Sequence, residues 1–259
     1  MYRTTAFFLF FLLFSSCATD GLWADVLVEP SVIFLNDGTR ARTFRILSRE
    51  KVPVMVSLRV IPGNAGGANT DAQPERSLVA YLKTGDSSVV LLPGAQQQIT
   101  CEASLPAALP QGEYWARIVV AWTAGEQQAG ADSADGSSSV IGVVYRKGEA
   151  FADVKLVSAG GTRESDGVHF YVDLIPLGNA AYRGNMLVDI KNTRNKIVYT
   201  THRPVDIYDR QRQVLDIKDK SMPPGRYKAI IRFNTEREDL GNEALPVLPK
   251  EYKIDFNMP

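Results

Sequence analysis

The stretch PQGEYWARI, residues 110–118, returns in altered form as PGRYKAII, residues 224–231. When Gly112 is set against Gly225, the tyrosine, the alanine and the isoleucine that follow each glycine coincide at the same offsets. A glycine can adopt the backbone of a tight turn, and a tyrosine two residues later can enter the core while its hydroxyl bonds back to that turn. Chance recurrence of Gly-x-Tyr before a strand is the alternative, but the shared offsets favour an internal repeat.

This arrangement is the tyrosine corner of immunoglobulin-like sandwiches. The rest of the chain agrees, because short β-rich runs alternate with turn clusters and no long helical period with caps occurs. The expected strands cover residues 26–35, 43–47, 52–61, 78–82, 88–92, 97–103, 114–123 and 140–146, then 151–157, 168–177, 184–191, 197–201, 212–216, 227–234 and 252–256. We therefore predict an all-β chain of two immunoglobulin-like β-sandwich domains, residues 25–147 and 148–259, joined near residues 146–149.

The composition of the chain and the spacing of its reactive residues argue against several classes of function. The 259 residues carry 29 Lys and Arg against 29 Asp and Glu with no basic block, so a nucleic-acid partner is not expected. His169 and His202 lie on different expected strands, without a cysteine or paired carboxylate at metal-ligand spacing, and no nucleophile elbow or phosphate-binding glycine loop occurs. Cys101 lies in an alternating stretch and is interpreted as a small buried hydrophobe. We expect no enzyme activity, no cofactor and no metal.

The first 24 residues are typical of a secretory signal peptide. After Arg3 comes an apolar run, residues 6–14, that is too short to span a bilayer and is followed by small residues. Three processing sites stay open: a cut after Ala18, a cut after Ala24, and a bacterial lipobox, FSSC at residues 14–17, in which Cys17 would be lipidated and become the mature N-terminus. We therefore expect export, with lipidation of Cys17 as a possible tether to the membrane.

The order of several motifs in the first block resembles the periplasmic pilus chaperones of the PapD type. These motifs are VLVEPSVIFL (residues 26–35), KVPVMVSL (51–58), LLPG (91–94), LPQGEY (109–114) and VVYR (143–146). The resemblance covers about residues 25–147 well and the second block in outline. It implies a two-domain periplasmic chaperone for pilus or fimbrial assembly, which lends its seventh strand to complete the sheet of a secreted subunit. It also allows an outer-membrane assembly protein as a second partner.

The resemblance implies a partner-binding site on the seventh strand. Its residues would be Val140, Ile141, Val143, Val144, Tyr145 and Arg146. Two features depart from the family: residues 131–139 lack the large apolar side chains of a lending strand, and the positions of the family's Arg and Lys clamp hold Ser31 and Gly142. Arg146 and Lys147 are the alternative cations, although charged residues at a domain junction commonly form interdomain pairs.

Two functions therefore stay open at this point. The first is a non-enzymatic envelope protein that binds an extracytoplasmic subunit by strand-edge pairing, for which Val143→Asp or Val144→Asp should abolish capture without unfolding. The alternative is a structural or adhesive lipoprotein, tethered to the outer membrane through Cys17, whose sandwiches serve as spacers or binding modules.

Overall fold

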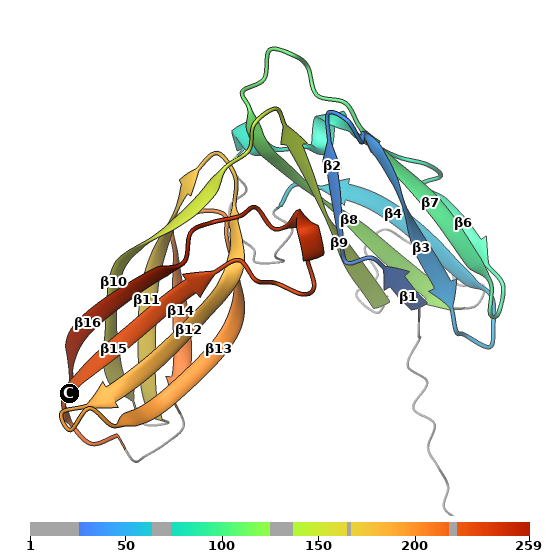
Figure 1. The fold of residues 1–259 in the computed structure, drawn as a ribbon. Helices are drawn as coiled ribbons and strands as arrows, with labels where there is room; N and C mark the ends of the chain where they lie inside the picture. The colour runs from blue at the N-terminus through green and yellow to red at the C-terminus, as the bar shows by residue number, and fades with distance from the viewer. Residues whose placement is uncertain (1–25, 64–73, 125–136, 165–166, 218–221) are drawn as a thin grey trace, which may run out of the picture.

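A computed structural model describes residues 26–63, 74–124, 137–164, 167–217 and 222–259 of the chain. It consists of strands and three short 3-10 helices, arranged as two sandwiches that meet at an angle (Figure 1). None of the described residues belongs to a helix long and apolar enough to cross a membrane. Cys17 and the predicted signal peptide lie outside the described residues. The all-β prediction with two immunoglobulin-like sandwiches is confirmed.

The first sandwich packs a four-stranded sheet against a five-stranded one. The four-stranded sheet runs β1 (Val26–Glu29), β3 (Ala41–Ser48), β7 (Gln96–Ala103) and β5 (Leu82–Thr84). The five-stranded sheet runs β2 (Val32–Asn36), β9 (Ser137–Lys147), β8 (Gly112–Ala124), β4 (Val54–Ile61) and β6 (Ser88–Leu91). Alternate residues of these strands form one core, and the face of the five-stranded sheet opposite this core is called the outer face below.

Two expected strands of the first domain take a different form. The run at residues 26–35 divides at Pro30: β1 pairs with β3 in one sheet, and β2 pairs in parallel with β9 in the other. Proline has no N–H to give to a sheet ladder, so a strand readily changes sheets there. The run at residues 78–82 is largely the 3-10 helix η2 (Val79–Tyr81), because the N–H groups of Tyr81 and Leu82 both donate to the carbonyl of Leu78. The short helix η1 (Pro74–Arg76) precedes it.

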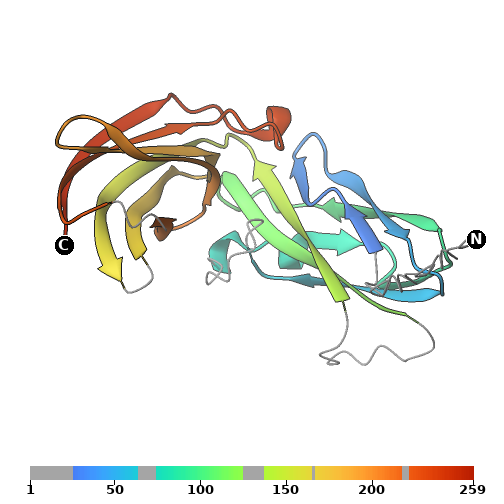
Figure 2. The same cartoon turned by 90° about the horizontal axis from the view of Figure 1, so that it is seen from below.

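The second sandwich repeats the plan with seven strands. One sheet runs β10 (Ala152–Glu164), β11 (Gly167–Gly178) and β14 (Gln211–Ile217). The other runs β13 (Ile197–Ile207), β12 (Tyr182–Asn192), β15 (Gly225–Asn234) and β16 (Lys250–Met258). The connection from β15 to β16 holds the 3-10 helix η3 (Gly241–Glu243), which reaches toward the first domain (Figure 1). Figure 2 shows the C-terminus at the end of the second domain farthest from the first.

Both tyrosine corners form as predicted. The hydroxyl of Tyr114 donates to the carbonyl of Pro110 at 2.8 Å, and that of Tyr227 donates to the carbonyl of Pro223 at 2.7 Å. Gly112 and Gly225 begin β8 and β15 with φ of 126° and 151°, a region that side chains rarely enter. The internal repeat in the sequence therefore marks the same structural element in each domain.

Candidate functional site

Strand β9 carries the predicted partner-binding residues and has one half-open edge. Along its whole length it pairs with β8, from Gly112↔Lys147 to Trp122↔Ser137. On its other side β2 covers only residues 142–146, beginning where the N–H of Gly142 donates to the carbonyl of Ser31 at 2.9 Å. Within the described part of the chain, no strand pairs with residues 137–141 on that side.

The direction of the main chain decides which groups this open edge offers. Successive residues of a strand turn their N–H and C=O groups to opposite neighbours. Because the N–H of Gly142 points toward β2, the main-chain groups of Val140 and Ser138 point the same way, beyond the end of β2. These two residues therefore present an unpaired stretch of backbone to any strand that approaches.

The six predicted residues divide into separate environments. Ile141, Val143 and Tyr145 belong to the first core. Val144 packs in a second cluster between the domains, and Arg146 lies in an ion pair there. Only Val140 combines a partly exposed side chain with an open main-chain edge. The accessible part of the predicted site is consequently shorter than the sequence suggested, and it includes Ser138, which the prediction omitted.

A cation that the sequence did not point to lies on the neighbouring strand β8, on the side of β9 opposite to this edge. Arg117 of β8 is the cross-strand partner of Gly142, one of the two positions at which the family clamp is replaced. Its Nε is buried with no hydrogen-bond partner among the described residues. Gly63, at φ 142°, makes room for the side chain, because a Cβ there would come within 2.6 Å of the Arg117 Cδ. The alternation of residues 112–118 could have placed Arg117 on the outer face, but not next to Gly142.

The two cations that the sequence offered instead are already bound. Nε of Arg146 contacts Oε1 of Glu113 at 3.0 Å, and its Nη2 donates to the carbonyl of Glu243. Nζ of Lys147 donates to the carbonyls of Ala107 and Leu109. Arg146 thus forms the interdomain pair that was the alternative expectation for it.

Glu113 is the centre of the contact between the domains. Its side chain is 0% exposed and accepts hydrogen bonds from Arg183 of β12 at 2.8 Å, from Arg146 at 3.0 Å and from the main-chain N–H of Ala181 at 3.1 Å. Burial would raise the pKa of Glu113, but the guanidinium groups of Arg183 and Arg146 outweigh it and hold this pKa below the ordinary value of 4.5. We call this group of Glu113, Arg146 and Arg183 the elbow.

Aromatic side chains enclose the elbow. Phe34, Trp115, Val144, Ala181 and Tyr208 form one buried cluster from both domains. The rings of Trp115 and Tyr208 meet edge to face with centroids 5.3 Å apart, and the Arg146 guanidinium lies 4.8 Å from the centroid of Phe34. A buried ionic group inside an apolar shell is strong only in one geometry, so these contacts set the angle between the domains.

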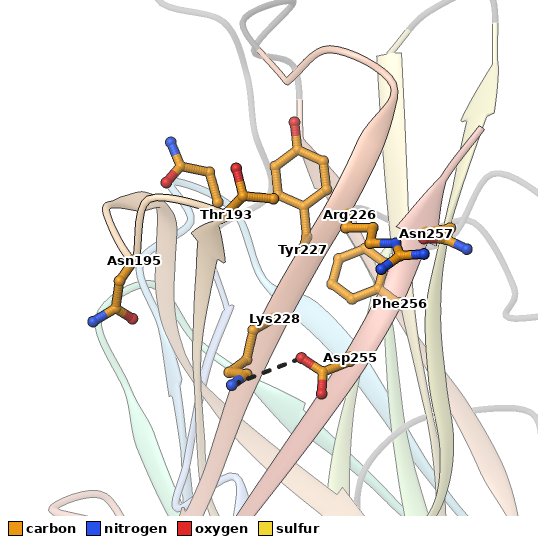
Figure 3. A pocket seen from close by; sticks show the side chains of 9 residues that line it. Thr193, Asn195, Arg226, Tyr227, Lys228, Asp255, Phe256 and Asn257 are labelled. Carbon is orange, nitrogen blue, oxygen red and sulfur yellow. Dashed lines mark ion pairs between the residues drawn. The ribbon is translucent and has the colours of Figure 1, made fainter.

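A pocket lies elsewhere, at the far end of the second domain. It is an open hollow of about 840 Å³ beside the second tyrosine corner (Figure 3). Its lining consists of Asn192, Thr193, Asn195, Arg226, Tyr227, Lys228, Asp255, Phe256 and Asn257. Lys228 and Asp255 form a 3.8 Å ion pair across it, and both side chains are well exposed. The hollow therefore has the character of a solvated sheet end.

Two further observations concern metal-ligating and nucleophilic side chains. Among the described residues, no three His, Cys, Asp or Glu side chains are grouped to hold a metal ion. Cys101 is fully buried, and this burial raises the pKa of its thiol to about 11. A thiol in that state is a poor nucleophile, which agrees with its interpretation as a small core residue.

The comparison with known proteins rests on structure. No protein-family model matches this chain, and no curated protein matches it in sequence. The YadV chaperone is similar over 89% of this chain and 100% of its own, with 9% identity and a TM-score of 0.50. A complex of SafA pilin with the SafB chaperone from Salmonella enterica (12% identity, TM-score 0.48, 90% of this chain and 97% of that one) and the CsuC–CsuE pre-assembly complex from Acinetobacter baumannii (14%, 0.46, 91% and 100%) also match. This chain has the PapD-like chaperone fold.

Proposed function

We propose that this protein is a non-enzymatic, chaperone-like protein of the bacterial periplasm that binds a secreted, pilus-like subunit by strand addition. The observation that carries the proposal is the open edge of β9 at residues 137–141, flanked by the end of β2. A subunit with an incomplete sheet exposes unpaired backbone that is prone to aggregation, and an added strand satisfies it.

The side chains along this edge define what the subunit must offer. Ser137, Ser138 and Ser139 are small, and Val140 alone is both apolar and partly exposed. A groove that accepts this strand would gain little from apolar burial beyond Val140. The affinity would therefore come mainly from main-chain hydrogen bonds, with Val140 setting the register.

Arg117 supplies the charge that Ser31 and Gly142 do not. A guanidinium on the outer face of β8, opposite Gly142 of β9, can hold the terminal carboxylate of a bound subunit by charge-assisted hydrogen bonds. Its buried Nε without a partner supports this role, because a bound anion would satisfy it.

The first test changes the backbone of the open edge. A C-terminally tagged chain is isolated from its native envelope under mild conditions, the co-purifying subunit is identified by mass spectrometry, and its capture by variants is measured. Val140→Pro removes one outward N–H, and proline is tolerated at a strand edge, so we expect capture to fall about tenfold or more. Val140→Thr keeps that N–H and should retain capture. Equal capture by both variants would refute strand addition at this edge.

This variant replaces the aspartate substitutions that the sequence suggested. Val143 and Val144 are both 0% exposed, in the first core and in the cluster between the domains. An aspartate at either position would bury an unpaired charge and unfold the region, so loss of capture would say nothing about binding.

The second test separates the carboxylate site from general surface charge. Arg117→Gln should weaken capture by about 10- to 100-fold, the range for one hydrogen bond to a charged group, and Arg117→Lys should restore part of it. Arg59 is the matched control, because it lies on the outer face of β4 and is exposed. If Arg59→Gln weakens capture as much as Arg117→Gln, Arg117 holds no specific carboxylate.

A further inference from the structure

The end of the first domain remote from the elbow carries four exposed apolar side chains. They are Val52, Met55, Val90 and Leu92, with 44%, 38%, 59% and 62% of their surface exposed, and we call them the tip patch. Most of the other apolar residues on these strands are buried, including Val54 and Leu91. Single exposed apolar side chains are ordinary, but a contiguous group marks an interaction surface.

Strand register brings two of the four side chains together, and the other two follow or precede them closely in the chain. Met55 of β4 lies directly opposite Val90 of β6, and Val54 lies opposite Leu91. Directly opposed side chains are about 4.5–5.5 Å apart at their Cβ atoms, and Val52 and Leu92 continue the same two chains past the strand ends. Because β6 is an edge strand, the patch occupies one corner of the domain.

The first described strand begins at this same end of the domain. Val26 lies opposite Ser48, whose N–H donates to the carbonyl of Ala95, and Ala95 follows the turn after Leu92. Cys17 stands nine residues before Val26 in the sequence, and the apolar run at residues 6–14 precedes it. Nine residues span at most about 30 Å, so a lipid on Cys17 would hold this end of the molecule close to a bilayer.

The charges beside the patch suit an anionic surface. Arg49 and Lys51 are exposed immediately before Val52, whereas Glu50 between them turns its Oε1 into the protein. Exposed apolar side chains next to basic residues are a combination that binds at the boundary between lipid headgroups and acyl chains.

We propose that the tip patch docks on the surface of an anionic lipid bilayer. This inference goes beyond the proposed function, since two strands, β8 and β4, separate β6 from β9. At the usual strand spacing this places the open edge of β9 about 14 Å across the sheet from the patch. The tip patch and the open edge are therefore formed by different strands.

The test measures vesicle binding without the anchor. Full-length protein carrying Cys17→Ala, as processed by the cell, is floated with vesicles of phosphatidylethanolamine and phosphatidylglycerol, and separately with phosphatidylcholine vesicles. We expect binding to the anionic vesicles, weakened by salt, and a loss of about tenfold or more in the double variant Val90→Asp with Leu92→Asp. The matched control is Phe151→Asp with Leu248→Asp, which removes two apolar residues that are at least as exposed, 62% and 85%, away from the patch.

Three results would overturn the proposal. The first is that the parent protein fails to float with anionic vesicles, and the second is that the control pair loses as much binding as the tip pair. The third is that a photoreactive amino acid in place of Val90 gives, in intact cells, an adduct with a protein and none with lipid. Failure here is distinguishable from failure of the proposed function, because the tip pair should keep its capture of the subunit and Val140→Pro should keep its flotation.

Discussion

The two tyrosine corners share their core residues and differ in almost everything on the other face of the strand. Tyr114 and Tyr227 are 1% and 6% exposed, and the alanine and isoleucine that follow each are fully buried. Between them, the first corner has Glu113 and Trp115, which are buried in the contact between the domains. At the same positions the second corner has Arg226 and Lys228, which are exposed around the hollow of Figure 3.

The difference shows that a repeated motif specifies only one side of a strand. Side chains alternate between faces, so the residues at even offsets from each glycine meet the core of their own domain. The residues at offsets 1 and 3 meet whatever lies outside, and this is a second domain for β8 and solvent for β15.

The largest difference in stability is expected when the charged residue directly after each glycine is made neutral. Glu113→Gln leaves Arg183 buried without its counter-charge and should lower the free energy of unfolding by about 3–5 kcal/mol. Arg226→Gln changes an exposed side chain and should stay within about 0.5 kcal/mol of the parent. Urea unfolding of both variants measures these losses of unfolding free energy. Similar losses would show that the buried ion pairs of the elbow stabilise the protein no more than an exposed charge does.

The next difference is expected between the two glycines. Gly225→Ala should cost about 1–3 kcal/mol from backbone strain alone, since a Cβ there meets nothing within 4 Å. Gly112→Ala also places its Cβ only 2.4 Å from the carbonyl oxygen of Asn179 in the second domain, and this clash should cost about 1–3 kcal/mol more. Urea unfolding of the two variants tests this, and a Gly225→Ala loss as large as that of Gly112→Ala would contradict the close approach at the elbow.

The two hydroxyl groups should behave alike. Tyr114→Phe and Tyr227→Phe each remove one hydrogen bond to a proline carbonyl, and each should lower the free energy of unfolding by about 1 kcal/mol. Thermal unfolding of the two variants side by side checks this. A large difference would mean that the corners are not equivalent even on their core side.

The smallest effect is expected from mild acid. Because the pKa of Glu113 is lower in the folded protein than its ordinary value of 4.5, its contribution to stability is fully present above about pH 4.5. That contribution is lost only as the pH falls further, through the folded-state pKa. The gap in unfolding free energy between the parent and Glu113→Gln should thus stay constant from neutral pH to about pH 4.5 and shrink below it. If the difference in unfolding free energy between the two proteins widened below about pH 4.5, it would contradict a lowered pKa of Glu113 in the folded protein.

Much of the fold could be predicted from the pattern of residues near each strand. Alternation and turn residues indicated the strands, and the paired Gly-x-Tyr-x-Ala motif located both corners. The prediction was wrong at residues 78–82, where hydrogen bonds to the carbonyl of Leu78 form a 3-10 turn, and residues 26–35 change sheets at Pro30. A short apolar run does not indicate which segment will form its main-chain hydrogen bonds. These two differences therefore could not be predicted from the local sequence.

The candidate site was predicted only in part. The sequence placed it on the strand of Val140 and Val144, but the parallel cover by β2 restricts the open edge to the upstream half. Arg117, for which we propose the carboxylate-binding role, was missed because its cross-strand partner, Gly142, lies far along the chain. Glu113 was missed because its role depends on Arg183 in the other domain.

The β class, the two sandwiches and the residues that face each core can be predicted from the amino-acid sequence, because periodicity and local turn chemistry indicate them. Which half of β9 stays open, which arginine lies opposite Gly142 and which carboxylate joins the domains depend on tertiary packing. Those features depend on contacts between residues distant in the chain. Such contacts follow from the packing of whole sheets, and no local pattern encodes them.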